Sequence, residues 1–151
     1  MKNSLILTFL ILLLSTSCLT TGGGMTSNVY KYNNIAFKNK TWNMSNIQID
    51  YRSTTQNQED HVFYIFSGLA AKNKIAIEKN SDAPIIAELW LSEESIIKNL
   101  RTVNSITILL ILKEKESQKQ ILTCQYSEET SESLNSSLYL TKVLEAVIKK
   151  V

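Results

Sequence analysis

The sequence predicts an α+β fold, a two-layer sandwich in which two helices lie on one face of a mainly antiparallel sheet of about four strands. Three observations lead to this prediction. Several short segments alternate apolar and polar residues, as half-buried strands do. Two longer segments repeat apolar residues at helical spacing, as helices with one buried face do. The order is strand, helix, a run of strands, then helix, and stacking both helices on one sheet face buries the two apolar surfaces most economically.

The predicted strands are short segments distributed along the chain. They cover residues 29–37, 46–52, 75–79, 85–92, 105–113 and 120–127. The run SITILLILK at 105–113 is the most apolar, which indicates a central strand, and the charged turn after it predicts an antiparallel hairpin with the next strand. Residues 93–102 fit either a short helix or a continued strand. Asn33 and Asn34 interrupt the first segment and make it the weakest candidate.

The predicted helices have different N-terminal signals. The first covers about residues 57–73, and Glu59 and Asp60 place negative charge in its first turn, where the helix dipole favours it. The second follows the polar stretch EETSE and runs to the C-terminus, with Thr130 or Ser131 as its N-cap.

The composition limits the class of protein. The 151 residues include 16 basic and 14 acidic side chains, a formal net charge of +2. A chain this close to neutral lacks the basic stripe of a nucleic-acid binder, so no nucleic-acid partner is expected. The length fits one domain with a real core and is too short for two.

The N-terminal segment has the layout of a secretory signal peptide. Lys2 supplies a positive start, residues 5–14 form an apolar run broken only by Thr8, and small residues follow up to Ser17. The apolar run has about half of the roughly 20 residues that a membrane-spanning helix needs. Cleavage after Ser17 is therefore expected.

Cys18 directly after small residues resembles the lipobox of bacterial lipoproteins, in the relaxed form found in spirochaetes. Ser15 holds the usual Leu position, and Leu14 lies one residue further out. The resemblance implies cleavage between Ser17 and Cys18, acylation of Cys18 with lipid and fatty acids such as palmitate, and the lipid bilayer as a partner. Plain secretion, which also cuts after Ser17, and a retained anchor stay open as alternatives. The residue after the cysteine is Leu19. Enteric sorting uses Asp at that position for inner-membrane retention, so Leu19 favours the outer membrane.

These observations divide the chain into three parts. We expect a signal peptide over residues 1–17, a lipidated cysteine and flexible tether over residues 18–28, and a single α+β domain over residues 29–151. The glycine-rich sequence of the tether supports mobility. If Cys18 were not acylated, a disulfide with Cys124 would be plausible; otherwise Cys124 is interpreted as a small apolar strand residue.

The sequence offers little for catalysis. It contains no phosphate-binding glycine loop, no nucleophile elbow and no zinc-binding motif. His61, after Glu59 and Asp60, could suggest a metal site, but consecutive helical side chains fan apart. We therefore expect no enzyme activity, no cofactor and no metal.

Aromatic residues are the candidates for a partner surface. Tyr30, Tyr32, Phe37 and Trp42 cluster in the most irregular part of the domain, and Trp90 shares the more polar face of its strand with Glu88. If exposed, such residues often dominate binding. The alternative is that they cover a sheet edge or fill the core.

The complete layout resembles small envelope lipoproteins such as the LptE-like family, which combine a lipobox, a short tether and a β-α-β-β-β-α domain. The stretch DAPIIAEL at residues 82–89 resembles a strand start common in that class. The resemblance implies a non-catalytic binding or assembly accessory of the cell envelope, with an envelope protein or glycolipid as partner. The alternatives are a surface-exposed lipoprotein that binds host or environmental ligands, and an exported enzyme of unknown reaction. Combined substitution of Asp50, His61 and Glu88 would test the enzyme alternative.

Overall fold

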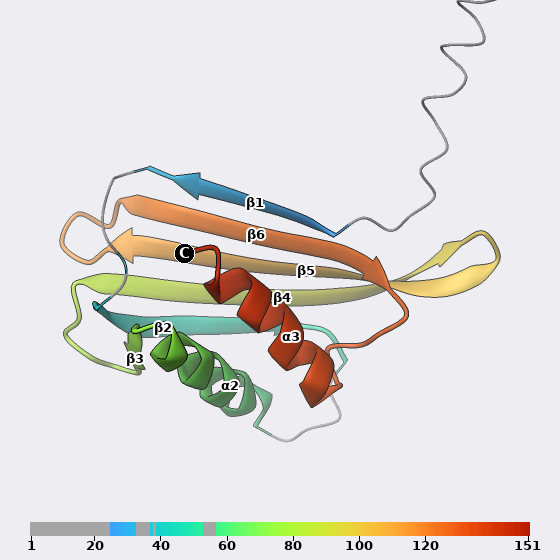
Figure 1. The fold of residues 1–151 in the computed structure, drawn as a ribbon, viewed down its shortest axis with the longest axis horizontal. Coiled ribbons are helices and arrows are strands. Elements are labelled where there is room, and N and C mark those ends of the chain that lie inside the picture. The colour runs from blue at the N-terminus through green and yellow to red at the C-terminus, as the bar shows by residue number, and fades with distance from the viewer. Residues whose placement is uncertain (1–24, 33–36, 38, 53–56) are drawn as a thin grey trace, which may run out of the picture.

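The computed structural model describes residues 25–32, 37, 39–52 and 57–151, and in this part of the chain two helices cover one face of a six-stranded sheet (Figure 1). The predicted α+β fold with both helices on one face is therefore confirmed. The predicted signal peptide, Cys18 and the first part of the tether lie outside the described residues.

The sheet is mixed and mostly antiparallel. Its strands are β1 (Thr26–Lys31), β2 (Thr41–Asp50), β3 (Ala76–Glu78), β4 (Ile85–Lys98), β5 (Arg101–Glu114) and β6 (Gln120–Thr130), in the order β1-β6-β5-β4-β2-β3. The neighbouring pairs β1–β6, β6–β5 and β5–β4 are antiparallel. Strand β2 is parallel to both of its neighbours, β4 and β3. A parallel pair needs a crossover, and α2 supplies it. Because β1 begins at Thr26, the last residues of the predicted tether belong to the sheet.

The two helices match the predicted segments with one correction. Helix α2 spans Gln58–Lys72 and buries Val62, Phe66, Leu69 and Ala70. Helix α3 spans Ser137–Ile148, and the hydroxyl of its N-cap Ser136 accepts a hydrogen bond from the backbone N–H of Tyr139. The predicted caps Thr130 and Ser131 were wrong, because β6 stays paired with β5 as far as Thr130 and the helix begins only after a loop.

The core lies between the sheet and the helices. In the register, Leu89 on β4 lies opposite Leu110 on β5, which lies opposite Cys124 on β6, and all three side chains are fully buried. Cys124 thus behaves as the small apolar residue that the sequence predicts. No helix among the described residues is long and apolar enough to span a membrane.

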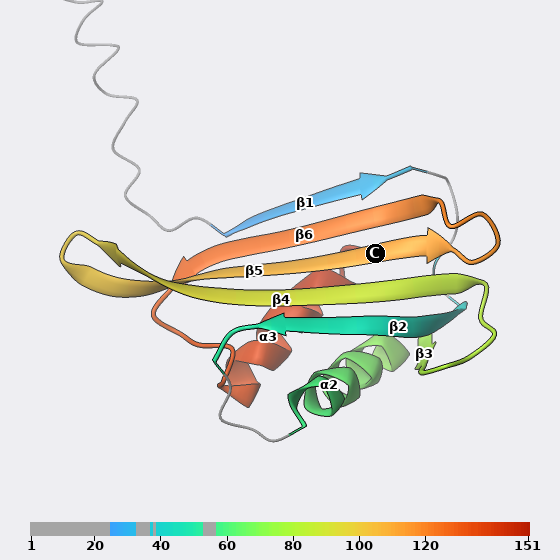
Figure 2. The ribbon, with the colours of Figure 1, turned by 180° about the vertical axis from the view of Figure 1, so that it is seen from behind.

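The β4–β5 hairpin is longer than the rest of the sheet and projects beyond it (Figures 1 and 2). Both strands have 14 residues. Of the two predicted alternatives for residues 93–102, the continued strand is correct as far as Lys98, whereas Arg101 and Thr102 already belong to β5. Asn99 and Leu100 form the turn between the paired residues Lys98 and Arg101, both with positive φ, 52° and 62°. This backbone is typical of a two-residue type I′ hairpin turn.

Candidate functional site: the open face of the sheet

The face of the sheet turned away from the helices is not covered by any described segment (Figure 2). Side chains alternate along a strand, so the residues between the core positions of β4 and β5 point to this face. They include Trp90, which is 40% exposed, and its cross-strand partner Leu109. Ile111, two residues along β5 from Leu109, and Ile86, four residues along β4 from Trp90, are half-buried on the same face. The centre of the open face is therefore apolar and partly accessible to solvent.

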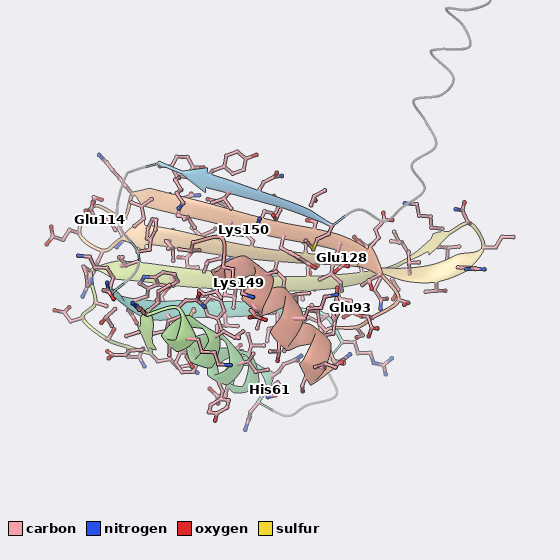
Figure 3. The ribbon with its side chains drawn as sticks, in the orientation of Figure 1. His61, Glu93, Glu114, Glu128, Lys149 and Lys150 are labelled. Atoms are coloured by element: carbon pink, nitrogen blue, oxygen red, sulfur yellow. The ribbon has the colours of Figure 1, made fainter. Side chains whose placement is uncertain are left out.

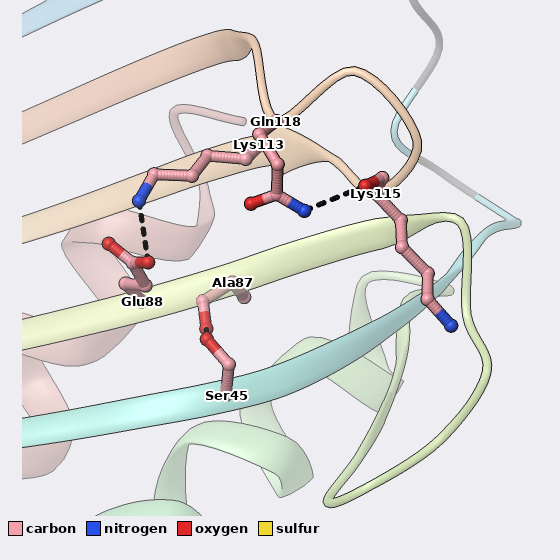
Figure 4. Close-up of polar contacts among 6 residues, drawn as sticks. All are labelled: Ser45, Ala87, Glu88, Lys113, Lys115 and Gln118. Atoms are coloured by element: carbon pink, nitrogen blue, oxygen red, sulfur yellow. Dashed lines mark hydrogen bonds and ion pairs between the residues drawn. The ribbon is translucent and has the colours of Figure 1, made fainter.

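An ion pair lies within this apolar surface. The Lys113 Nζ and the Glu88 Oε1 are 2.6 Å apart and join β5 to β4 (Figure 4). Both side chains are only 20–28% exposed. Because the two charges neutralise each other, the centre of the face carries no net charge, which suits an apolar or aromatic partner more than an ionic one.

Strand β1 adds an aromatic side chain to the same face. Tyr30 lies opposite Thr123 on β6, and Thr123 lies opposite Ile111 on β5. Residues directly opposite each other share a face, so Tyr30 lies on the same face as Trp90, three strands away and level with Glu88. We call Tyr30, Ile86, Trp90, Leu109 and Ile111 the open-face patch.

The predicted aromatic residues divide between surface and core. Tyr30 and Tyr32 are more than half exposed, and Trp90 is accessible on the open face. Phe37 is 3% exposed and Trp42 is 0% exposed, so both fill the core, which was the alternative interpretation. These two residues are not part of a partner surface in this structure.

Three patch residues were missed as site candidates in the sequence: Ile86, Leu109 and Ile111. A signal for two of them was present, because the run at 105–113 has apolar residues at both alternating positions. Such a pattern indicates a strand with two apolar faces. The sequence could not indicate that one of those faces would be left without a covering helix.

The residues considered for catalysis do not come together. The His61 Nε2 lies 3.2 Å from the Ser137 hydroxyl, in the helix layer, and the Asp60 carboxylate pairs with Lys79 at 2.5 Å. Asp50 lies opposite Ser92, four residues along β4 from Glu88. Among the described residues, no group of His, Cys, Asp and Glu side chains could hold a metal ion.

Two carboxylates lie on the helix side of the sheet, near the start of α3 (Figure 3). Glu93 and Glu128 flank Ile106 in the register. The Glu128 Oε2 accepts hydrogen bonds from the hydroxyls of Tyr126 and Tyr139, at 2.5 and 2.8 Å. The pKa of both phenols is raised, mainly by burial and secondly by the hydrogen bonds that they donate to Glu128. Both tyrosines therefore stay protonated as donors, an arrangement that holds structure in place.

Glu93 has an equally structural environment. Its Oε2 accepts from the backbone N–H of Leu134 at 2.7 Å and from the Ser133 hydroxyl at 3.1 Å. These bonds tie the loop between β6 and α3 to β4. Glu93 and Glu128 are therefore assigned to the fold and not to acid–base chemistry.

A groove of about 550 Å³ lies at the opposite end of the sheet, where β4 begins and β5 ends. Its lining comprises Lys40, Asp82, Pro84, Ile85, Glu114, Lys115, Glu116 and Ile121. Two of these lining residues, Lys115 and Asp82, form an ion pair, and the hydrogen bond from Lys115 lowers the pKa of the Asp82 carboxyl. Charges of both signs line the groove, so it favours no single class of ligand.

The fold and the open face define a small α+β domain with one sheet face available for contacts. The PelC dodecamer from Paraburkholderia phytofirmans has a similar fold, with a TM-score of 0.56 and 13% sequence identity over 85% of this chain and 98% of that chain. A variant of the same PelC dodecamer gives a TM-score of 0.52 and 14% identity over 85% and 94% of the two chains. At these identities the likeness concerns the fold alone.

Lipoprotein GNA1162 from Neisseria meningitidis is similar over 74% of this chain and 96% of that chain, at 8% identity. Its TM-score of 0.49 is too low to support an inference. No protein-family model and no curated protein matches the sequence.

Proposed function

We propose that this chain is a membrane-anchored lipoprotein of the bacterial cell envelope that acts as a non-catalytic binding or assembly accessory. Cys18 would carry the lipid after cleavage behind Ser17, and the outer membrane is the expected location. The open-face patch would contact the partner, an envelope protein or a glycolipid. An LptE-like role is one form of this function.

The observation that carries the proposal is the open-face patch itself. Trp90 and Tyr30 are exposed and Leu109 is half-buried, although the domain has enough apolar residues for a complete core on the other side. An exposed apolar surface on one sheet face, with an internal ion pair and no net charge, is typical of an interaction site. The likeness of the fold to PelC is compatible with a small domain of this kind.

The anchor can be tested by metabolic labelling with a clickable fatty acid. The wild type should take up label, and Cys18→Ala should not. Label in both proteins, or in neither, would remove the lipid anchor from the proposal. In the second case, plain secretion would replace it, and a search for a Cys18–Cys124 disulfide would follow.

The patch can be tested by a photo-crosslinking amino acid placed at position 90 in living cells. The matched control carries the same group at position 64, where Tyr64 is 79% exposed on the outer side of α2. We expect a discrete adduct from position 90 that is lost when Leu109→Glu is added, and no such adduct from position 64. Protease digestion of the adduct separates a protein partner from a glycolipid. Equal adducts at both positions would argue against a specific surface.

The two alternative functions have separate tests. A surface-exposed lipoprotein would be digested by protease added to intact cells, whereas a periplasmic one would be digested only after the outer membrane is opened. An exported enzyme would lose its cellular phenotype on combined substitution of Asp50, His61 and Glu88. Because Glu88 pairs with Lys113 on the open face, the matched comparison substitutes Asp50 and His61 alone, and we expect that variant to keep its function, because the structure separates these residues.

A further inference from the structure

The tip of the β4–β5 hairpin exposes apolar side chains without any covering segment in the described chain. Leu100 is 99% exposed and Ile97 is 82% exposed. Ile96 and Val103 lie opposite each other just behind the turn and are half-buried. Single exposed apolar residues are common on protein surfaces, but a projecting tip that gathers several is a distinct feature.

The backbone makes the residue at position 100 unusual. Leu100 has a φ of 62°, in the left-handed region. A type I′ turn favours Asn or Gly at its two central positions, and Asn99 fits this preference. A leucine at the second position is unfavourable for the backbone and leaves its side chain in water. Since neither folding nor solubility explains it, the side chain is better explained by an external contact.

The hairpin projects at the end of the sheet where the described chain begins (Figures 1 and 2). In the register, Thr26 lies opposite Ser127, which lies opposite Thr107. Thr107 in turn lies opposite Ser92, so the start of β1 is level with Ser92. From Ser92 to Lys98 the strand continues for about 20 Å, at roughly 3.3 Å per residue.

This length can be compared with the reach of the N-terminal segment. A chain from Cys18 to Met25 spans at most about 25 Å when fully extended. The hairpin tip extends about 20 Å beyond the start of β1 on the same side. The extended segment from Cys18 to Met25 is therefore only a few ångströms longer than the projection of the tip. A lipid surface that holds Cys18 is thus within reach of the tip.

The charge of the tip suits a lipid surface with anionic headgroups. Lys98 and Arg101 flank the turn on opposite strands. Lys98 pairs with Glu129 at 2.6 Å, while Arg101 is exposed and forms no ion pair among the described residues. An apolar tip with a basic residue beside it can place its leucine among the acyl chains while the guanidinium stays with the headgroups.

We propose that the tip of the β4–β5 hairpin inserts into the lipid surface to which the chain is anchored, with Leu100 and Ile97 in the apolar layer and Arg101 at the headgroups. The inference rests on the proposed lipid attachment at Cys18. The tip would then be a second contact with the membrane, in addition to the lipid on Cys18. Two contacts fix the orientation of the sheet relative to the membrane, and with it the orientation of the open-face patch.

The test uses the chain from Cys18 to Val151, which contains every described strand and helix and all core residues. It is coupled through the Cys18 thiol to a maleimide lipid in phosphatidylethanolamine–phosphatidylglycerol vesicles. Cys124 does not compete, because it is fully buried and burial raises the pKa of its thiol. The probe is Leu100→Trp in a Trp90→Phe background, and the control is Tyr64→Trp in the same background. The buried Trp42 is present in both, and its signal is subtracted with the Trp90→Phe parent.

Quenching of tryptophan fluorescence by lipids with brominated acyl chains is then measured. We expect at least threefold stronger quenching for Leu100→Trp than for Tyr64→Trp, together with a blue shift of its emission. Adding Arg101→Glu should reduce the quenching severalfold. Equal quenching of probe and control, or none, would overturn the proposal. Because the anchor is supplied chemically, this result does not depend on whether cells acylate Cys18, and fatty-acid labelling reports on that point alone.

Discussion

The Tyr139 hydroxyl on α3 and the Glu128 carboxylate on β6 are joined by a hydrogen bond of 2.8 Å. The bond links the helix layer to the sheet near the point where the chain passes from one to the other. Tyr126 on β6 donates to the same oxygen at 2.5 Å, so one carboxylate oxygen positions two largely buried rings.

Removal of this link should destabilise the domain without changing its fold. Tyr139→Phe deletes one donor to a charged acceptor, and we expect a loss of about 1–2 kcal/mol in the free energy of unfolding. Urea denaturation followed by circular dichroism measures it. Tyr64→Phe, on the exposed side of α2, is the matched control and should change stability by less than about 0.5 kcal/mol. A loss of equal size in both variants would contradict the role of the link.

The same two tyrosines predict a loss of stability in alkaline solution. Burial and donation to Glu128 raise the pKa of Tyr126 and Tyr139 in the folded state, whereas a phenol in the unfolded chain titrates near pH 10. Above about pH 10 the unfolded state therefore binds fewer protons than the folded state, and the free energy of unfolding falls as the pH rises.

This pH effect can be separated from the loss of hydrogen bonds. The double variant Tyr126→Phe with Tyr139→Phe should be less stable at pH 8 and should lose less further stability between pH 10 and 12. Urea midpoints across this range give both quantities. The same alkaline slope in the wild type and the double variant would show that other groups control it.

Glu93 should matter more than its neighbour Glu94. Glu93→Ala leaves the backbone N–H of Leu134 and the Ser133 hydroxyl without their acceptor, and we expect a loss of about 2 kcal/mol. Glu94 is exposed, so Glu94→Ala should be nearly neutral. Thermal unfolding of the two variants gives the comparison. Hydrogen exchange should also increase at the start of α3 in Glu93→Ala only.

The hairpin turn should become more stable when its leucine is removed. Leu100→Gly places the residue best suited to positive φ at position 100, and we expect a gain of about 1 kcal/mol. Thr102→Gly lies nearby in extended backbone and should instead lose roughly 0.5–1 kcal/mol. Both are measured by urea denaturation. If Leu100→Gly were destabilising, the leucine would serve the fold, and the argument for an external contact would fail.

The layers of the fold could be predicted because they depend on patterns along the chain. The alternation of Ile85, Ala87 and Leu89, and the helical spacing of Val62, Phe66 and Leu69, place apolar residues on single faces. The parallel pairing of β2 with β4 and the length of the β4–β5 hairpin depend on contacts between distant segments. The charged residues Glu93 and Lys98 interrupt the apolar alternation in the second half of β4, so the sequence did not indicate its full length. The Asn99–Leu100 turn lacks the glycine that is typical of such hairpin turns.

The candidate site was predicted in part, for a similar reason. Trp90 and Tyr30 were recognised as possible surface residues, but their membership in one patch depends on a register that joins four strands. Phe37 and Trp42 are aromatic as well and are buried, because their position in three dimensions decides exposure. The N-cap of α3 was misplaced because several Ser and Thr residues compete for that position before Ser136.

Strand β1 also has a mechanical consequence. It is an edge strand whose six residues are all paired with β6, from Thr26 opposite Ser127 to Lys31 opposite Leu122. Ladder hydrogen bonds lie perpendicular to the strands, so a pull on Met25 along the strand axis loads them in shear, all at once. The rate of forced unfolding, and not equilibrium stability, then sets how long the domain withstands tension from its N-terminal side.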